Sequence, residues 1–323
     1  MAKINSRGGM EPEHGQESSE QPITSSAAKK LYNSFIDIKK SFSEEPEPLD
    51  FVMSGFLSGT VGTLFSPGAT GKSFLSLQLA IDIASGADSL GLGITKAGKV
   101  LYLAAEDPAL IISKRLHDIG KLLNPRIRKA TVTNLRIAAI AGKNVNVHTD
   151  EYLQTIIEAC ADDTRLIVID TISRVHTLEE NSNSDMAKLL QTLERIAAQT
   201  NAAVLFLHHI SKSTALAGVG DTQQAARGAS VLTDNSRFGA SLTTMGKKEA
   251  EQYAIPETER RSYIRYCVVK NNYAPPINDL WFKRVAGGTL VSITLDKNQK
   301  QPAETEDVPD PLAATSSKWE GYM

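Results

Sequence analysis

Cysteine is scarce in this chain of 323 residues, which has only Cys160 and Cys267. Two cysteines so far apart, without metal-ligand spacing, exclude a disulfide framework and a zinc site. They are typical of a reducing compartment, so we expect a cytoplasmic protein. No hydrophobic run approaches about 18 residues, the length that a membrane span needs. No apolar stretch follows the first Lys and Arg residues, so the sequence predicts no secretory signal.

An excess of positive charge is also missing. The 35 Lys and Arg residues are balanced by 37 Asp and Glu residues, which gives a net charge of −2. A protein that covers its surface with nucleic acid is normally basic. Any DNA binding is therefore expected to be local, in a channel or on a few loops.

The two ends of the chain are polar and lack a regular hydrophobic pattern. We expect disorder over residues 1–28 and in the tail at 296–323. Apolar residues recur at spacings of three and four between 27 and 42, which predicts a short amphipathic helix. A stiff acidic linker follows, so residues 1–48 are expected to form an arm outside the core.

Strand and helix signals alternate from residue 49 to residue 295. Strands apolar on both faces alternate with helices, which predicts an α/β fold with a mostly parallel twisted sheet and helices on both faces. The expected strands are 62–65, 100–104, 134–138, 166–169 and 203–207, and the expected helices are 73–84, 108–120, 150–161 and 184–200. Antiparallel strands are expected to extend this sheet at 238–244, 262–270, 280–284 and 289–295.

A glycine-containing turn joins the first of these strands to the first helix. Glycine lets backbone N–H groups curl around an anion, and the positive end of the helix dipole favours negative charge there. Lys72 would reach the β- and γ-phosphates of ATP, and the Ser73 hydroxyl would ligate Mg²⁺. The pattern is that of a phosphate-binding loop, although Ser66 replaces the usual first glycine. The predicted nucleotide-binding residues are Gly68, Ala69, Thr70, Gly71, Lys72, Ser73 and Phe74.

An acidic residue at the end of a buried strand is the expected partner of this loop. Asp170 follows the apolar run Leu166–Ile169, and we expect it to hold Mg²⁺ together with Ser73. Many ATPases carry a catalytic Glu directly after this Asp, but Thr171 stands there. The catalytic base must therefore come from elsewhere in the chain.

Glu106 is the predicted general base. It follows the strand expected at 100–104, and ligands gather at the carboxyl ends of parallel strands. From there its carboxylate would orient and deprotonate a water molecule in line with the γ-phosphate. Asp107 is the competitor, but it is better placed to cap the helix expected at 108–120.

Several short motifs follow one another along the chain. They are Gly71-Lys72-Ser73, Ala105-Glu106-Asp107, Ile169-Asp170-Thr171, Leu207-His208-His209-Ile210-Ser211-Lys212, Ala225-Ala226-Arg227-Gly228, Thr233-Asp234-Asn235-Ser236-Arg237 and Lys270-Asn271-Asn272-Tyr273. In this order they resemble the RepA-type hexameric replicative helicases of broad-host-range plasmids, within the RecA/DnaB-like ATPases. The resemblance runs from about Leu49 to Leu295. It implies a homohexameric ring with ATP at each subunit interface and single-stranded DNA in the central channel.

The resemblance also implies roles for single residues. His209 matches the residue that senses the γ-phosphate, and it is preferred over His208 because it lies nearer the following loop. A neighbouring subunit has to supply a cation to the transferred phosphoryl group. The resemblance offers Arg237 for this role, with Arg227 as the rival.

Two further cations are candidates for the nucleotide site. DnaB-like helicases carry Lys-x-Arg on a late strand, and here that position reads Lys270-Asn271-Asn272, so Lys270 is a candidate acting in trans. Arg115, on the helix after Glu106, is a candidate for the same phosphate. A solvated helix arginine is the alternative.

Two loops are candidates for binding DNA. One follows Asp170 and contains Arg174, and the other follows His209 and contains Lys212 and Arg227. Both are expected next to the γ-phosphate and would contact the DNA backbone without reading its sequence. Ordinary solvated loops are the alternative.

The leading hypothesis is therefore an ATP-dependent replicative DNA helicase, for plasmid or mobile-element replication, with a replication initiator or a primase as a further partner. A RecA-like recombination or DNA-remodelling ATPase is the first alternative. A regulatory nucleotide-binding module is the second.

Overall fold

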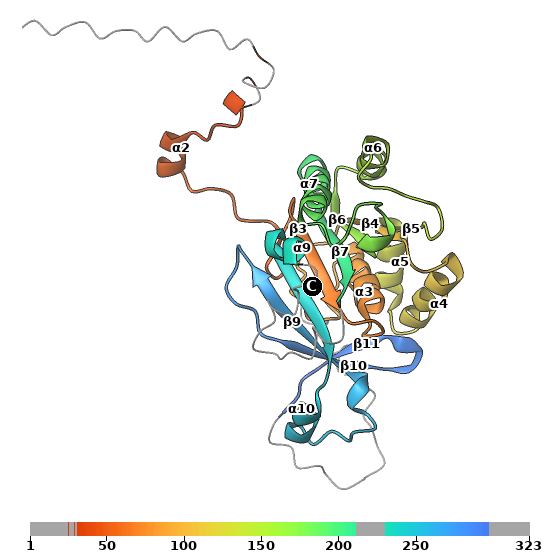
Figure 1. Cartoon of the computed structure of the whole chain (residues 1–323). Helices are drawn as coiled ribbons and strands as arrows, with labels where there is room; N and C mark the ends of the chain where they lie inside the picture. Colours follow the sequence, from red (N-terminus) through yellow and green to blue (C-terminus); the bar gives the residue numbers. More distant parts are fainter. Residues whose placement is uncertain (1–24, 26–28, 30, 211–229, 297–323) are drawn as a thin grey trace, which may run out of the picture. The chain divides into compact units, whose positions relative to one another are not determined.

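The computed structural model describes residues 25, 29, 31–210 and 230–296 (Figure 1). The chain separates into two units, Met1–Pro48 and Leu49–Met323. The expectations of disorder at the two ends, and most of the loop after His209, fall outside the described residues.

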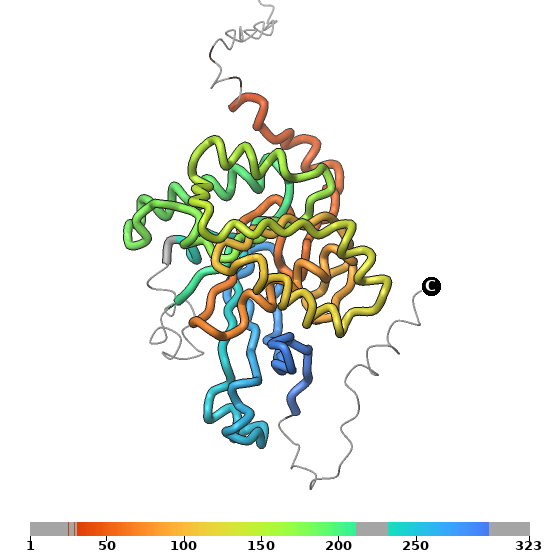
Figure 2. The backbone as a smooth tube through the Cα atoms, turned by 90° about the vertical axis from the view of Figure 1, so that its right-hand side faces the viewer, coloured from red at the N-terminus to blue at the C-terminus, as the bar shows by residue number. Residues whose placement is uncertain are grey.

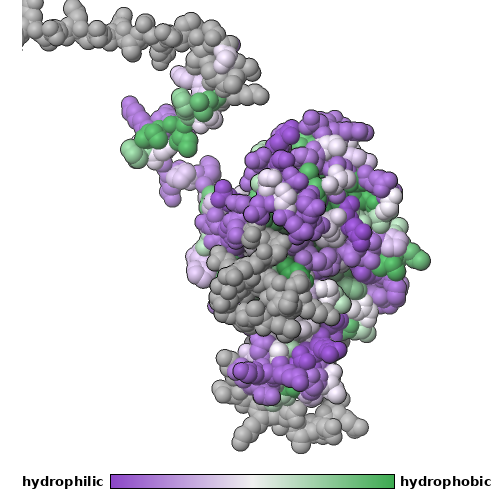
Figure 3. All heavy atoms as spheres, in the orientation of Figure 1, coloured by the Kyte–Doolittle hydropathy of each residue, from purple (hydrophilic) through white to green (hydrophobic). Residues whose placement is uncertain are grey.

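The N-terminal unit contains the short helix α2 (Ile38–Ser43). The continuous helix expected at 27–42 is wrong, because the chain leaves helical conformation at Phe35–Asp37. The Asp37 side chain accepts a hydrogen bond from the backbone N–H of Lys40 at 2.9 Å, so a new helix begins there. The apolar side chains of this unit are exposed, and they include Leu31, Tyr32, Phe35, Ile36, Ile38 and Phe42 (green in Figure 3).

A nine-stranded mixed sheet forms the core of the second unit, in the order β11-β10-β9-β8-β3-β7-β6-β4-β5. The predicted α/β fold is confirmed. Strands β8, β3, β7, β6, β4 and β5 are parallel, whereas β9, β10 and β11 continue the sheet antiparallel. Their bounds are β3 (Val61–Ser66), β4 (Lys99–Ala104), β5 (Leu135–Ala139), β6 (Thr164–Asp170), β7 (Ala203–His209), β8 (Phe238–Thr244), β9 (Tyr263–Asn271), β10 (Leu280–Arg284) and β11 (Leu290–Ile293).

Helices cover both faces of this sheet. On one face lie α3 (Lys72–Ser85), α4 (Ala109–Gly120) and α5 (Pro125–Asn134), and on the other lie α6 (Asp150–Ala159), α7 (Asn183–Thr200) and α9 (Ser230–Asn235). In Figure 2, α4 and α5, in yellow, face the viewer. The remaining short elements are β1 (Phe51–Met53), β2 (Phe56–Leu57), η1 (Ile172–Arg174), α10 (Lys247–Gln252), η3 (Arg260–Ser262) and η4 (Ala286–Gly288).

The alternation of side chains along each strand builds two separate cores. In β7, Leu205 and Leu207 face α3, whereas Val204 and Phe206 face α7. The neighbouring strands β4 and β6 follow the same alternation. A residue at the end of one of these strands therefore lies on the side of α3 when it is an even number of positions from the residues that face α3.

The hairpin β1–β2 and the helices α5 and α10 were not expected from the sequence. Pro125 opens α5 at its first turn, and the Asn124 side chain caps it by accepting the N–H of Ile127 at 2.9 Å. With only partly buried and exposed residues, α5 lacks the strong apolar stripe that identifies a helix. Within the described residues, no helix is both long and apolar enough to cross a membrane.

Candidate nucleotide site

The phosphate loop connects the end of β3 to the start of α3. Ala69 and Gly71 adopt positive φ angles of 63° and 114°. Only glycine adopts the second of these without strain, and Gly71 is the residue that caps α3. The Thr70 hydroxyl donates to the Pro67 carbonyl at 2.9 Å, which holds the turn closed. The helix therefore points its positive end into the loop, as an anion site requires.

Lys72 is buried beneath this loop, with 6% of its surface exposed. Its ammonium donates to the carbonyl oxygen and the hydroxyl of Ser66, at 3.0 and 2.9 Å. Burial lowers the pKa of Lys72 to about 8, and the negative charges of Asp170 and Glu106 oppose this shift. The residue that replaces the usual first glycine thus provides hydrogen-bond acceptors for the lysine.

Asp170 ends β6 in a buried position on the side of α3. The Tyr102 hydroxyl donates to one of its carboxylate oxygens at 2.7 Å, and the Ser76 hydroxyl lies 2.8 Å from that of Tyr102. Burial raises the pKa of Asp170, although hydrogen bonds from Tyr102 and Ser73 lower it. Tyr102 and Ser76 were not predicted as site residues, because the hydrogen bonds that link them to Asp170 depend on the packing of α3 against β4 and β6.

The donor set fits Mg²⁺. Ser73 and Asp170 offer a hydroxyl and a carboxylate oxygen side by side, and Mg²⁺ prefers oxygen ligands with several positions left for water and phosphate. Within the described residues, no cluster of three or more His, Cys, Asp or Glu side chains has the arrangement of a metal site.

Glu106 lies at the same edge of the sheet, directly after β4. Its carboxylate is 3.3 Å from Nε2 of His209, and the other ring nitrogen, Nδ1, is 3.1 Å from the Lys72 ammonium. Glu106 and His209 are each about 40% exposed. The three side chains form a continuous chain from the phosphate loop to a solvent-accessible carboxylate.

The two histidines of β7 have different environments. His209 is in phase with Leu207 on the side of α3 and contacts Lys72, whereas His208 is in phase with Phe206 and is 9% exposed. Burial and the nearby positive charges of His209 and Lys72 lower the pKa of His208 to about 4. Among the described residues its Nδ1 has no hydrogen-bond partner. Only His209 is in contact with the site.

Asp107 does not cap α4, so that expectation is wrong. The N-cap is Pro108, without a side-chain hydrogen bond, and the Asp107 carboxylate instead lies 2.6 Å from Nη1 of Arg115. The guanidinium of Arg115 also stacks over the ring of Phe74, 5.4 Å from its centroid. Proline at this position fixes the φ angle of the cap, and Asp107 is left to pair with Arg115, about two helical turns further on. Arg115 is therefore an ion-paired residue beside α3, and only 20% of its side chain is exposed.

Arg237 and Lys270 lie at the opposite edge of the sheet. Arg237 precedes β8, whose first residue pairs with Gly62 at the start of β3, and Lys270 pairs with Gly239. The length of β3 separates Arg237 from the phosphate loop by about 17 Å, at about 3.3 Å per residue. Lys270 is level with Thr63 and lies two strands away from β3. Lys270 donates to the Asp234 carbonyl, and Arg237 is exposed. Arg237 therefore cannot reach the phosphate loop of its own subunit, and the Lys270 ammonium is bound to the Asp234 carbonyl instead.

Of the three predicted DNA-binding residues, the structure describes only Arg174. It is exposed at the end of η1, four residues after Asp170. Lys212 and Arg227, including its rival role as the cation in trans, lie outside the described residues.

Arg284 is a contact residue of the phosphate loop that the sequence did not indicate. Its Nη2 donates to the carbonyl of Thr70 at 2.5 Å and lies 3.3 Å from that of Ala69. More than 200 residues of chain separate these partners.

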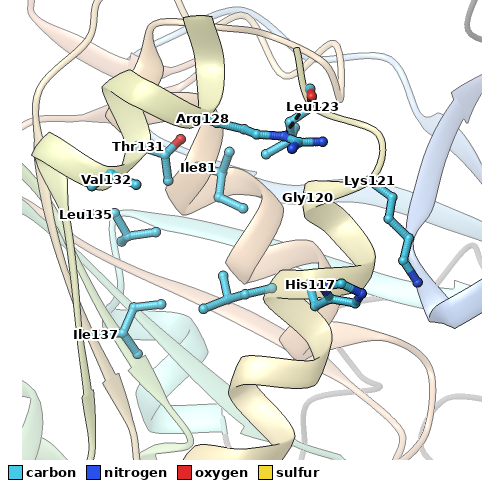
Figure 4. Close-up of a pocket in the computed structure, with 11 residues that line it drawn as sticks. Ile81, His117, Gly120, Lys121, Leu123, Arg128, Thr131, Val132, Leu135 and Ile137 are labelled. Carbon is cyan, nitrogen blue, oxygen red and sulfur yellow. Dashed lines mark hydrogen bonds between the residues drawn. The ribbon is translucent and has the colours of Figure 1, made fainter. Parts of the chain in front are cut away.

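A cavity of about 550 Å³ lies elsewhere, between α3, α4, α5 and β5 (Figure 4). Its apolar lining includes Ile81, Leu116, Leu123, Leu135 and Ile137. None of its lining residues belongs to the phosphate loop, β6 or β7. The nucleotide site is thus a surface of backbone amides and charged side chains, distinct from this apolar cavity.

Comparisons with known proteins identify the family of this chain and proteins of similar fold. A family model described as an AAA domain matches residues 30–215, which is more than half of the chain. A solved structure of a DnaB-like replicative helicase, described with its interactions with primase, is 12% identical, with a TM-score of 0.55 over 83% of this chain and 71% of that one. The crystal structure of the RadB recombinase is 16% identical, with a TM-score of 0.45 over 72% of this chain and 91% of that one. The helicase likeness shows the fold alone. The chain belongs to the AAA-domain family and is a P-loop ATPase with a RecA-like fold.

Proposed function

We propose that this ATPase is a replicative DNA helicase, a homohexameric ring that moves along single-stranded DNA during plasmid or mobile-element replication. The observation that carries the proposal is the separation of two sets of charged residues. Lys72, Glu106 and His209 gather at one edge of the sheet, and Arg237 and Lys270 lie at the other. To complete the site, a second subunit would have to place the end of its sheet that carries Arg237 against the phosphate loop of the first subunit.

The hydrolysis step follows from the residues at the loop. The loop amides and Lys72 would bind the triphosphate, and Ser73 and Asp170 would hold the magnesium ion. Bound Mg²⁺ neutralises phosphate charge and orients the oxygens for displacement. Glu106 would accept a proton from water as the water oxygen bonds to the γ-phosphorus and the bond to ADP breaks.

His209 supplies the connection from hydrolysis to movement. It lies between Lys72 and Glu106, so loss of the γ-phosphate changes the charge that its ring faces. It is also the last residue of β7, directly before the loop proposed to contact DNA. Arg174, after β6, would contact the same strand. The near-neutral net charge of −2 restricts such contacts to these loops.

An unwinding assay tests the proposal. Forked DNA with a 5′ or a 3′ tail is incubated with ATP and the full-length protein, and Lys72→Ala serves as the control without phosphate binding. Strand separation by the wild type alone, with ATPase stimulated by single-stranded DNA, is expected. Hydrolysis without strand separation, with filaments in place of rings in electron micrographs, would instead favour the recombination or remodelling ATPase. Absence of hydrolysis with and without DNA would favour a regulatory nucleotide-binding module.

A further inference from the structure

Two carbonyl groups of the phosphate loop point to one side chain of the antiparallel extension. Nη2 of Arg284, on β10, lies 2.5 Å from the Thr70 oxygen and 3.3 Å from the Ala69 oxygen. Gly71 lies against the same guanidinium, since a Cβ built there would be 3.2 Å from Nη2. In the part of the chain that the structure describes, Arg284 forms no ion pair with a carboxylate. Its charge is therefore directed to the loop.

Because of the geometry of the peptide unit, this contact also restricts the orientation of two backbone N–H groups of the phosphate loop. In a trans peptide the carbonyl oxygen and the N–H of the next residue point in opposite directions. The peptides after Ala69 and Thr70 are trans. Holding these two carbonyls toward Arg284 consequently directs the N–H groups of Thr70 and Gly71 away from it. Among the described residues those two N–H groups have no hydrogen-bond partner.

Contacts between α3 and the hairpin formed by β10 and β11 hold Arg284 in position. The Gln78 side chain, on α3, donates to the Leu290 carbonyl at 2.8 Å and accepts the Leu290 N–H at 2.9 Å. The turn between β10 and β11 packs closely on α3 as well, since a Cβ at Gly288 would be 2.7 Å from the Phe74 ring. The β10–β11 hairpin thus packs on α3, the helix that follows the phosphate loop.

We propose that Arg284 is a positioning residue of the nucleotide site: Nη2 of its guanidinium holds the Ala69 and Thr70 carbonyls outward, so that the following N–H groups face the phosphates. The inference rests on the nucleotide binding assigned to this loop and goes beyond it, because the antiparallel extension becomes part of the site. A free loop would sample other peptide orientations, and binding would then have to overcome their entropy.

Binding of a fluorescent ADP with Mg²⁺ to the full-length protein tests this role. Arg284→Met keeps an unbranched stem and removes the guanidinium donors, so we expect the affinity to fall about ten- to a hundredfold. Arg284→Lys keeps the charge on a shorter side chain whose ammonium cannot replace Nη2 at both carbonyls, and we expect a loss of about tenfold. Lys283→Met is the matched control on the same strand. Lys283 pairs with Glu259 at 3.1 Å, and this variant should bind as the wild type does.

Each variant separates one explanation from another. Wild-type affinity in Arg284→Met would overturn the proposal, and wild-type affinity in Arg284→Lys would show that charge alone matters, which overturns it too. The lysine variant decides the matter if Arg284→Met does not fold. Faster amide hydrogen exchange at Thr70 and Gly71 in Arg284→Lys, without a change at β7, would support it. A wild-type protein that binds no ADP would instead refute nucleotide binding itself.

Discussion

Glu106 is two residues past the end of β4, and its distance of 3.3 Å from His209 brings a carboxylate to the phosphate edge of the sheet. We predict that Glu106→Gln lowers ATP turnover about a hundredfold or more, since a general base contributes about 10² to 10⁴ in rate. ATP binding should remain, because the amide conserves shape and the loop is untouched. Steady-state hydrolysis and equilibrium binding measure the two effects, with the exposed Glu158→Gln as the control. Undiminished turnover would assign the base to another residue.

Tyr102 orients the carboxylate of Asp170 through a hydrogen bond. Tyr102→Phe removes the donor at 2.7 Å and leaves a buried carboxylate oxygen and the Ser76 hydroxyl without that partner. We expect the Mg²⁺ concentration for half-maximal nucleotide binding to rise about tenfold, and the free energy of unfolding to fall by about 1–3 kcal/mol. Tyr266→Phe, at another buried tyrosine, should leave the Mg²⁺ dependence unchanged. An equal Mg²⁺ shift in both variants would argue against a specific role of Tyr102.

Among the helices, α3 carries a buried acid, Asp82, whose titration makes the stability of the folded protein depend on pH. Asp82 accepts hydrogen bonds from the Ser89 hydroxyl at 2.8 Å and the Leu90 N–H at 3.2 Å, and burial raises its pKa to about 7. In the unfolded chain this carboxyl ionises near pH 4. Between these values only the unfolded state loses the proton, so the contribution of Asp82 to stability falls as the pH rises from about 4 to about 7.

Asp82→Asn removes this titration while keeping an acceptor for Leu90 and a donor for Ser89. We predict that the variant gains stability relative to the wild type between pH 5 and pH 8, by roughly 1 kcal/mol or more. Urea unfolding at both pH values measures the difference, and Asp162→Asn, at an exposed carboxylate, controls for general charge effects. A constant difference at the two pH values would show that Asp82 is ionised throughout.

At the scale of the whole molecule, the proposed ring depends on residues from two subunits meeting at one nucleotide. Arg237→Ala should abolish hydrolysis although its own phosphate loop is intact, because Arg237 lies at the opposite edge of the sheet. Mixing Arg237→Ala with Lys72→Ala subunits should restore part of the activity, since a lysine from one subunit and an arginine from its neighbour then meet. Hydrolysis rates across mixing ratios measure this. A mixture as inactive as each variant alone would contradict sharing of the site, and Lys270→Ala tests the second cation in the same way.

Local sequence patterns were enough to identify the phosphate loop and the order of the main strands and helices. Alternating apolar strands and helices, a glycine turn before Lys72 and an acid after the strand β6 are local patterns, and each is set by the chemistry of a few adjacent residues. Strand periodicity also fixes which residues share a face once the strand limits are known. The contact of His209 with Lys72, and the burial of His208, follow from that alternation.

The order of neighbouring strands in the sheet, and the distant side chains that come into contact, depend on how the whole chain folds. Strand β7 lies between β3 and β6, and this order sets His209 between Lys72 and Glu106. The pairing of Asp107 with Arg115 replaced the expected helix cap, and Arg115 itself packs over the ring of Phe74 on α3. Arg284 reaches Thr70 across more than 200 residues of chain. Such contacts depend on how the extension folds back on α3, and no pattern of neighbouring residues encodes that geometry.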